Sequence, residues 1–350
     1  MKVYYIAYII LILTLLSCNG VDKSKDNEQF YTTQDSLTDE DRLKMLNDSL
    51  GKYPNDIKLW LAKGELCKKN LDFKCALDAG ARSFKLDSTN LQARELYAWT
   101  LINKPNAPLS DIETAQRHYE YILSISPKNP QVLVDLANTY SLTGDFKTAF
   151  KYINDALRID ERYRDAYVLK GSIYRVMEKY DLALSSYQTA LQMDPNFFMG
   201  QLETGWLLTQ MEKHDLALEY YQNAVELQPN NINAIYGVAK SYQDLANYDE
   251  ALFHYRKLAK VSPKFYITFF NQAFIKQYHQ NQLDSAAYYY DKAIRIFPEY
   301  KEAWYQLGEV YLAQKRTTDA ARAFSESLHI DPHFEPALDG AKRLKNFKYE

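Results

Sequence analysis

From residue 57 onward, apolar and polar positions recur with a period of about 34 residues. Within each period the apolar residues are three or four positions apart, which predicts two short helices separated by a turn. An alanine marks the start of each predicted second helix, at Ala76, Ala115, Ala149, Ala183, Ala217, Ala251, Ala286 and Ala320. A small residue lies inside each predicted first helix, at Gly64, Ala98, Ala137, Gly171, Gly205, Ala239, Ala273 and Gly308. Small side chains at these two places allow paired helices to approach each other closely.

Aromatic residues occupy core-facing positions of the same pattern. One turn after the recurring alanine stand Tyr119, Tyr187, Tyr221, Tyr255, Tyr290 and Phe324. The first helices carry Tyr140, Tyr174, Tyr242 and Tyr311 at positions that are also expected to face the core. Packing therefore accounts for most of the 30 tyrosines. Proline closes six of the eight periods, at Pro127, Pro195, Pro229, Pro263, Pro298 and Pro332, because it cannot continue a helix.

Two stretches show the pattern in full: residues 164–197, RDAYVLKGSIYRVMEKYDLALSSYQTALQMDPNF, and residues 301–334, KEAWYQLGEVYLAQKRTTDAARAFSESLHIDPHF. The pattern resembles the tetratricopeptide repeat (TPR), a helix–turn–helix unit. The resemblance implies an all-α fold, a right-handed α-solenoid of about eight repeats within residues 37–347. The repeats are expected at residues 57–90, 91–129, 130–163, 164–197, 198–231, 232–265, 266–300 and 301–334. Residues 38–53 and 335–346 are expected to form capping helices, because an open end would expose apolar core.

Two repeats depart from the period. The second carries about five extra residues around NKPNAPLS, residues 103–110, which form either a functional loop or a tolerated insertion. The seventh has one extra residue and places Lys276 or Gln277 where an aromatic residue is expected. We therefore expect the helix pair of the seventh repeat to be bent or less tightly packed.

The N-terminus follows a different pattern. Lys2 precedes an apolar run from Val3 to Leu16, which is short for a membrane-spanning helix but suits the core of a signal peptide. The run ends in LLSC, residues 15–18, which resembles the lipobox of bacterial lipoproteins. The resemblance implies that residues 1–17 are removed and that the lipidated Cys18 anchors the chain to a membrane. The alternatives are a plain signal peptide or a short anchor helix with an incidental cysteine.

The lipobox also implies a location. Residues 18–36 contain the lipidated cysteine and a polar stretch without helical periodicity, which predicts a flexible tether. Asn19 stands where an aspartate would mark retention at the inner membrane. We therefore expect a lipid-anchored protein of the cell envelope at the outer membrane, on its periplasmic face or at the cell surface.

Charge and side-chain chemistry favour a binding protein over an enzyme. The formal net charge of −3 gives no basis for nucleic-acid binding. His329 and His333 have helical i,i+4 spacing, but Pro332 lies between them, which argues against a metal site. No catalytic motif occurs, and the carboxylates are interpreted as scattered surface charges. We expect no catalysis, no cofactor and no metal.

Two cysteines, Cys67 and Cys75, flank the turn of the first repeat. Outside the cytoplasm they can form a disulfide. Cys67 also occupies a core position, where a thiol packs as a small apolar side chain. The sequence favours this packed thiol over the bridge.

In the TPR family, the first helices line a concave groove that usually holds a partner peptide. By the family geometry, the early groove is polar and contains Lys58, Glu65, Lys68, Gln92, Asn138 and Ser141. The later groove is the candidate binding site for a protein or peptide; it contains Met199, Leu202, Trp206, Tyr236, Lys240, Gln243, Ile267, Phe270 and Phe274. The alternative is that some of these apolar side chains are tucked under neighbouring helices.

The sequence thus predicts a membrane-anchored scaffold or adaptor that binds a partner segment in its groove, within an envelope assembly, secretion or cell-wall complex. The rival hypothesis is a surface lipoprotein that binds a carbohydrate or another nutrient, with aromatic rings stacked on sugars. The short insertions of this chain count against that rival. Two known TPR binding modes, the chaperone-tail clamp and the asparagine ladder, lack their residues here.

Overall fold

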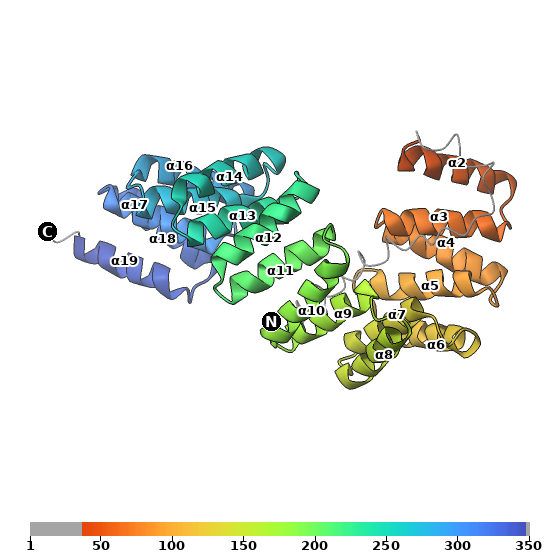
Figure 1. Ribbon diagram of the computed structural model, residues 1–350. Coiled ribbons are helices and arrows are strands. Elements are labelled where there is room, and N and C mark those ends of the chain that lie inside the picture. The colour runs from red at the N-terminus through yellow and green to blue at the C-terminus, as the bar shows by residue number, and fades with distance from the viewer. Residues whose placement is uncertain (1–36, 348–350) are drawn as a thin grey trace. The chain divides into compact units, whose positions relative to one another are not determined.

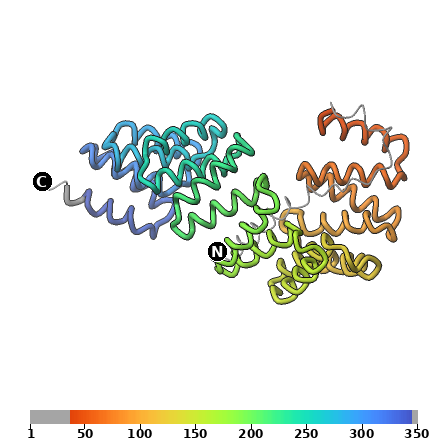
Figure 2. The backbone as a smooth tube through the Cα atoms, viewed as in Figure 1, coloured from red at the N-terminus to blue at the C-terminus, as the bar shows by residue number. Residues whose placement is uncertain are grey.

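The computed structural model describes residues 37–347, and its regular elements there are eighteen α-helices. They pair as helix–turn–helix repeats, which confirms the predicted fold class. The predicted signal peptide, Cys18 and the tether lie outside the described residues. The chain divides into two compact units, the first ending at Gly200 and the second beginning at Gln201. Within each unit, helix pairs stack one on the next (Figures 1 and 2).

The first helices of the repeats each have 13 residues: α3 (Ile57–Lys69), α5 (Leu91–Asn103), α7 (Pro130–Leu142), α9 (Arg164–Val176), α11 (Phe198–Gln210), α13 (Ile232–Asp244), α15 (Tyr266–Tyr278) and α17 (Lys301–Ala313). The second helices are α4 (Phe73–Leu86), α6 (Leu109–Ile125), α8 (Phe146–Ile159), α10 (Tyr180–Met193), α12 (His214–Leu227), α14 (Tyr248–Val261), α16 (Leu283–Ile296) and α18 (Thr317–Ile330). The two end helices are α2 (Asp39–Lys52) and α19 (Glu335–Phe347).

Local chemistry explains where many helices begin. Six of them start at an aspartate or asparagine whose side chain accepts a backbone N–H of the first turn, at Asp56, Asp72, Asn90, Asn129, Asp145 and Asn231. Helix α2 starts at Thr38, which forms a reciprocal capping box with Asp41. These caps satisfy N–H groups that have no partner inside the helix.

The turn between the paired helices is less evident from the sequence. In all eight repeats one turn residue has a positive φ, at Leu71, Asn106, Gly144, Glu178, Glu212, Ala246, Asn281 and Lys315. Only Gly144 is a glycine, the residue that adopts this left-handed region without strain. At the other positions the packing of the two helices therefore holds the chain in a conformation that local preference disfavours.

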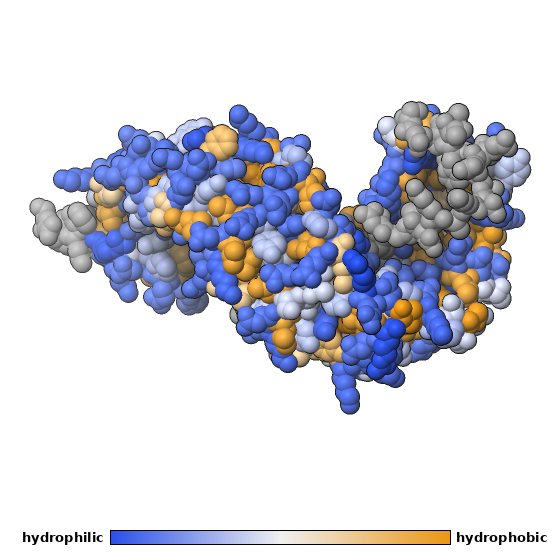
Figure 3. Space-filling view, in the orientation of Figure 1, coloured by the Kyte–Doolittle hydropathy of each residue, from blue (hydrophilic) through white to orange (hydrophobic). Residues whose placement is uncertain are grey.

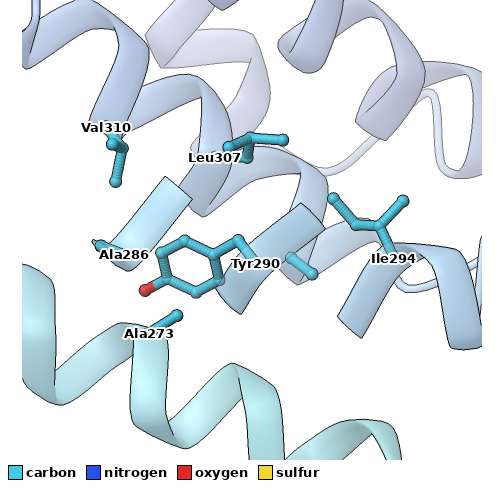
Figure 4. Packing of buried hydrophobic residues seen from close by; sticks show 7 residues of the cluster. Ala273, Ala286, Tyr290, Ile294, Leu307 and Val310 are labelled. Atoms are coloured by element: carbon cyan, nitrogen blue, oxygen red, sulfur yellow. The ribbon is translucent and has the colours of Figure 1, made fainter. Parts of the chain in front are cut away.

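The core lies between the first and second helices. Tyr119, Tyr187, Tyr255, Tyr290 and Phe324 are completely buried, and Tyr221 is 6 % exposed, which confirms their predicted positions. The small residues make room for these rings: a Cβ on Gly171 would lie 2.8 Å from the Tyr187 ring. Figure 4 shows the same arrangement around Tyr290, whose ring lies among Ala273, Ala286 and the α17 side chains.

The tyrosines of the first helices are less buried than expected. Tyr140, Tyr174, Tyr242 and Tyr311 are each half-buried. Tyr140 illustrates the reason, because its ring stacks on Tyr152 of the paired helix, with centroids 5.6 Å apart, and its hydroxyl donates to Glu120. These rings cover the edge of the core while their hydroxyls reach the surface.

The two irregular repeats keep the paired-helix arrangement. In the second repeat, α6 has 17 residues where the other second helices have 14, so most of the insertion lengthens this helix. Lys104 and Asp111 form an ion pair across the inserted turn. In the seventh repeat, the Tyr290 hydroxyl donates to Gln277 at 2.8 Å. The expected loose packing of that pair is wrong, because the extra residue lies in the turn and Ala273, Ala286 and Tyr290 are fully buried.

A disulfide joins Cys67 at the end of α3 to Cys75 at the start of α4. The preference for a packed free thiol is therefore wrong. Cys67 is buried at 2 % exposure, as a core residue would be, but the turn also brings the two Cα atoms within 5.8 Å. This separation is ordinary for a disulfide. The bridge ties the first helix pair together across its own turn.

Candidate functional site

In the second unit, the apolar members of the predicted groove lie on first helices. Leu202 and Trp206 belong to α11, Tyr236 to α13, and Ile267, Phe270 and Phe274 to α15; all six are half-buried. Met199 is in the first unit and is buried, at 8 % exposure. Figure 3 shows polar and apolar residues interleaved on the surface in view.

The aromatic members of this set use part of each ring for packing. The Phe270 ring centroid lies 4.9 Å from that of Tyr300 and 5.5 Å from that of Tyr290. Tyr236 packs against Phe265 at 5.8 Å and against Tyr255 at 6.3 Å. Both interpretations of the pattern thus apply in part: the inner edge of each ring is packed, and the remainder is accessible.

Phe274 lies one turn after Phe270, in the C-terminal half of α15. Its ring contacts Tyr278, with centroids 4.7 Å apart, and His279, at 5.9 Å. Tyr278 is 51 % exposed. Truncating Phe274 therefore removes accessible apolar area with less damage to the core than truncating Phe270.

Polar side chains connect three helices beneath these rings. The Tyr255 hydroxyl donates to Gln243 Oε1 at 2.8 Å and accepts from Asn271 Nδ2 at 3.0 Å. Burial raises the pKa of Tyr255 well above its usual value, so this hydroxyl stays neutral and serves as a hydrogen-bonding group. The predicted groove did not include Asn271, whose side chain joins α15 to the Tyr255 hydroxyl.

The two polar residues proposed for the groove already have internal partners. Gln243 accepts the Tyr255 hydroxyl through its carbonyl oxygen, and Lys240 forms an ion pair with Asp244 one turn along α13. Both side chains are half-buried. A ligand on this face would therefore meet a preorganised polar border instead of freely rotating side chains.

The polar residues of the early groove fall into two groups. Lys58, Glu65 and Gln92 are exposed, whereas Lys68, Asn138 and Ser141 are buried, at 9 %, 6 % and 4 % exposure. The Lys68 ammonium lies 3.9 Å from Glu65 and 5.2 Å from the centre of the Trp99 ring. Asn138 Oδ1 and Ser141 Oγ are buried atoms without a hydrogen-bond partner.

The first unit also gathers carboxylates that the sequence pattern wrongly suggested were scattered surface charges. Glu95 of α5 and Asp135 of α7 are half-buried, and Asp165 of α9 is 6 % exposed. Helix α5 contacts α3 and α7, and α7 contacts α9, so one face carries all three. Burial, with the nearby Glu95 charge, raises the pKa of Asp135 to about 7. Burial also raises the pKa of Glu95 and of Asp165.

The described residues contain neither a group of three metal ligands nor a helix that could span a membrane. Between residues 37 and 347, no three His, Cys, Asp or Glu side chains are arranged to hold a metal ion. His329 and His333 are both exposed. Over the same range, each helix is too short or too polar to cross a bilayer.

Comparison of the sequence with models of protein families identifies the repeat. Models described as tetratricopeptide repeat match residues 130–163, 165–197, 203–231, 232–265 and 277–344, which together make up more than half of the chain. A search of curated proteins by sequence found no significant match.

Solved structures share the fold at low sequence identity. A human IFIT1 dimer with PPP-AAAA aligns with a TM-score of 0.61 and 18% identity, over 89% of this chain and 79% of that chain. The C-terminal part of a TPR repeat-containing protein from Cytophaga hutchinsonii aligns with a TM-score of 0.57 and 19% identity, over 66% and 94% of the two chains.

The APC/C hetero-tetramer Cut9-Hcn1 contains a chain that aligns with a TM-score of 0.55 and 18% identity, over 89% of this chain. The present chain spans 60% of that longer one. At such identities the likeness shows the fold alone. The matched repeats, the helix pairs and the buried aromatic positions together place this chain in the tetratricopeptide repeat family.

Proposed function

We propose that this protein is a membrane-anchored scaffold or adaptor that binds a segment of a partner protein on its first-helix face. TPR proteins are generally protein–protein interaction scaffolds without catalytic activity, and the family matches of this chain include no enzymatic domain. Stacked repeats offer extended surfaces for such binding. The lipobox-like LLSC at residues 15–18 supports an anchor on Cys18.

The observation that carries the binding proposal is the row of half-buried aromatic rings on α13 and α15. Tyr236, Phe270 and Phe274 lie on the first helices of consecutive repeats, and each keeps part of its ring accessible. Clustered accessible apolar area marks interaction sites on soluble proteins. Aromatic side chains that are already held by packing lose little conformational freedom on binding, which favours them as hot spots.

Crosslinking and purification from native membranes tests this proposal with two matched variants. Phe274→Ala removes a half-buried ring from the first-helix face, whereas Phe253→Ala removes a ring that is 55 % exposed on the second helix α14. We expect a defined protein to be captured by the wild type and by Phe253→Ala, and to be lost with Phe274→Ala. Thermal unfolding of both variants shows whether the fold is intact. Equal capture by all three proteins would contradict the proposed face.

The anchor is tested separately through Cys18→Ala. In the proposed envelope setting, an assembly, secretion or cell-wall complex at the outer membrane, the wild type should incorporate a labelled fatty acid and sediment with that membrane. The variant should lose both properties, because it lacks the cysteine to which the acyl chains would be attached and so has no lipid anchor. Unchanged labelling and fractionation of the variant would refute lipidation at this cysteine.

A further inference from the structure

The carboxylates on the first helices of the first unit differ in whether a cation is paired with them. Asp165 is neutralised by Arg164, which donates to it from Nε at 2.8 Å and also reaches Asp194 at 2.7 Å. Lys68 is the cation whose charge bears on both Glu95 and Asp135, and it already lies near Glu65. Among the described residues, Glu95 and Asp135 form no ion pair, and Asp135 accepts a hydrogen bond from the neutral Gln131 at 3.1 Å.

The buried hydroxyl of Tyr119 lies near the same two carboxylates, Glu95 and Asp135. The core tyrosines of three other repeats each use the hydroxyl in a hydrogen bond: Tyr187 with Ser172, Tyr255 with Asn271 and Tyr290 with Gln277. Tyr119 is the equivalent residue of the second repeat; it is completely buried, and its hydroxyl has no partner. Asp135 follows Tyr119 by 16 residues, as Asn271 follows Tyr255, and the Asp135 and Glu95 charges both act on the Tyr119 hydroxyl.

Further acceptors extend this set along α7. Asn138 and Ser141 follow Asp135 at intervals of three residues, so they share a face of the helix. Asn138 Oδ1 and Ser141 Oγ are both buried and unpartnered. Unpaired buried polar atoms are uncommon in native proteins because each lowers stability, so a cluster of them needs an explanation. What the cluster lacks is a group that carries positive charge and several N–H donors.

We propose that the half-buried carboxylates of Glu95 and Asp135, which lie in front of the buried polar atoms of Tyr119 and Asn138, bind a lysine or arginine side chain from a partner protein. An ammonium or guanidinium group supplies a positive charge and several N–H donors, which are what these two carboxylates can accept. The half-buried setting strengthens the pairing, because charge interactions are less screened there than at an open surface.

The occupant is taken to be a protein segment because the proposed function makes this chain a scaffold, but the cluster is a different surface from the aromatic row of the second unit. A basic side chain in the cluster would select among partner segments by charge, while the aromatic row would contribute apolar contacts. The two sites can therefore fail independently.

Selection of random 12-residue peptides displayed on phage, against the immobilised full chain, tests the proposal. We expect the wild type to enrich peptides with lysine or arginine, and the double variant Glu95→Gln/Asp135→Asn to lose that enrichment. The control Glu113→Gln/Glu161→Gln removes the same charge from two exposed positions of the first unit and should select like the wild type. Far-UV circular dichroism confirms that each variant is folded.

One selected peptide then gives a quantitative test by fluorescence anisotropy. We expect its affinity to fall at least tenfold with the double variant, and equally when its basic residue is replaced by norleucine. The two losses should not add when combined, because both remove the same contact. Additive losses, unchanged affinity for the double variant, or a selection without basic peptides would each overturn the proposal. Peptides that depend on Phe274 but not on Asp135 would support the aromatic row alone and would also overturn it.

Discussion

Replacing the Asp135 carboxylate with an amide tests whether the first unit holds that charge at the expense of stability. In the unfolded chain the pKa of Asp135 is near its usual 3.8, whereas in the folded chain burial raises it to about 7. Between these values the folded state binds a proton that the unfolded state has released. The free energy of unfolding therefore falls as the pH rises through this window, and the loss is complete above about pH 7.

The size of the effect follows from the same shift. The roughly three pKa units, at about 1.4 kcal/mol each, set a ceiling of about 4 kcal/mol. Asp135 is half-buried, so water and the Lys68 charge reduce this, and we expect Asp135→Asn to raise the free energy of unfolding by about 1–3 kcal/mol above neutral pH. The amide can keep the hydrogen bond with Gln131. The gain should be much smaller at pH 4, where the carboxyl is protonated in the folded state and a substantial part of it is protonated in the unfolded state.

Urea denaturation followed by far-UV circular dichroism, at several values from about pH 4 to pH 8, measures this difference. Glu113→Gln, at an exposed position of α6, is the control and should change stability little at any pH. A gain for Asp135→Asn that is the same at every pH would show that the buried charge is not its cause. A loss of stability at pH 8 would refute the reasoning altogether, because it would mean that the carboxylate is stabilised by its surroundings.

Three further predictions concern packing and covalent structure, and urea denaturation measures each. Gly171→Ala should lower the free energy of unfolding by about 1–3 kcal/mol, since its Cβ would lie 2.8 Å from the Tyr187 ring. Gly51→Ala, which meets no atom within 4 Å, should instead raise it by up to about 1 kcal/mol through helix propensity. Tyr290→Ala should destabilise by about 3–5 kcal/mol because a completely buried ring is lost. Tyr290→Phe, which loses only the bond to Gln277, should destabilise by about 1 kcal/mol, and equal losses for the two Tyr290 variants would contradict the packing argument. Cys75→Ser should destabilise by about 2–3 kcal/mol through the short loop that the disulfide closes, and an effect that persists under reducing conditions would exclude this cause.

The repeat pattern was sufficient to predict the helix pairs and their buried aromatic residues. Each helix must place its apolar stripe against a neighbour. The period places the aromatic ring of a second helix opposite the small residue of its first helix, as with Tyr187 and Gly171. These contacts join helices that are close in the sequence. A single chain with eight copies of one pattern therefore contains enough information to locate them.

The candidate binding face was predicted only in outline. The period places Tyr236, Phe270 and Phe274 on first helices, but their degree of exposure depends on rings contributed by other elements. Tyr300, which follows α16, covers one edge of Phe270, and Phe265, which precedes α15, covers one edge of Tyr236. The polar side of the same face depends on Asn271, which meets Tyr255 across two helices.

By itself, the sequence determined the all-α repeat fold, the positions of the core rings and the lipobox-like N-terminus, because each is a local pattern. Tertiary structure decided what local patterns do not contain. It held Leu71 and Glu212 in left-handed turns against their own preference, because the packing of each helix pair outweighs the preference of one residue. It also brought Glu95 and Asp135 from separate repeats onto one half-buried face. Burial and charge coupling depend on which side chains meet in space, and that follows only from the stacking of the helices.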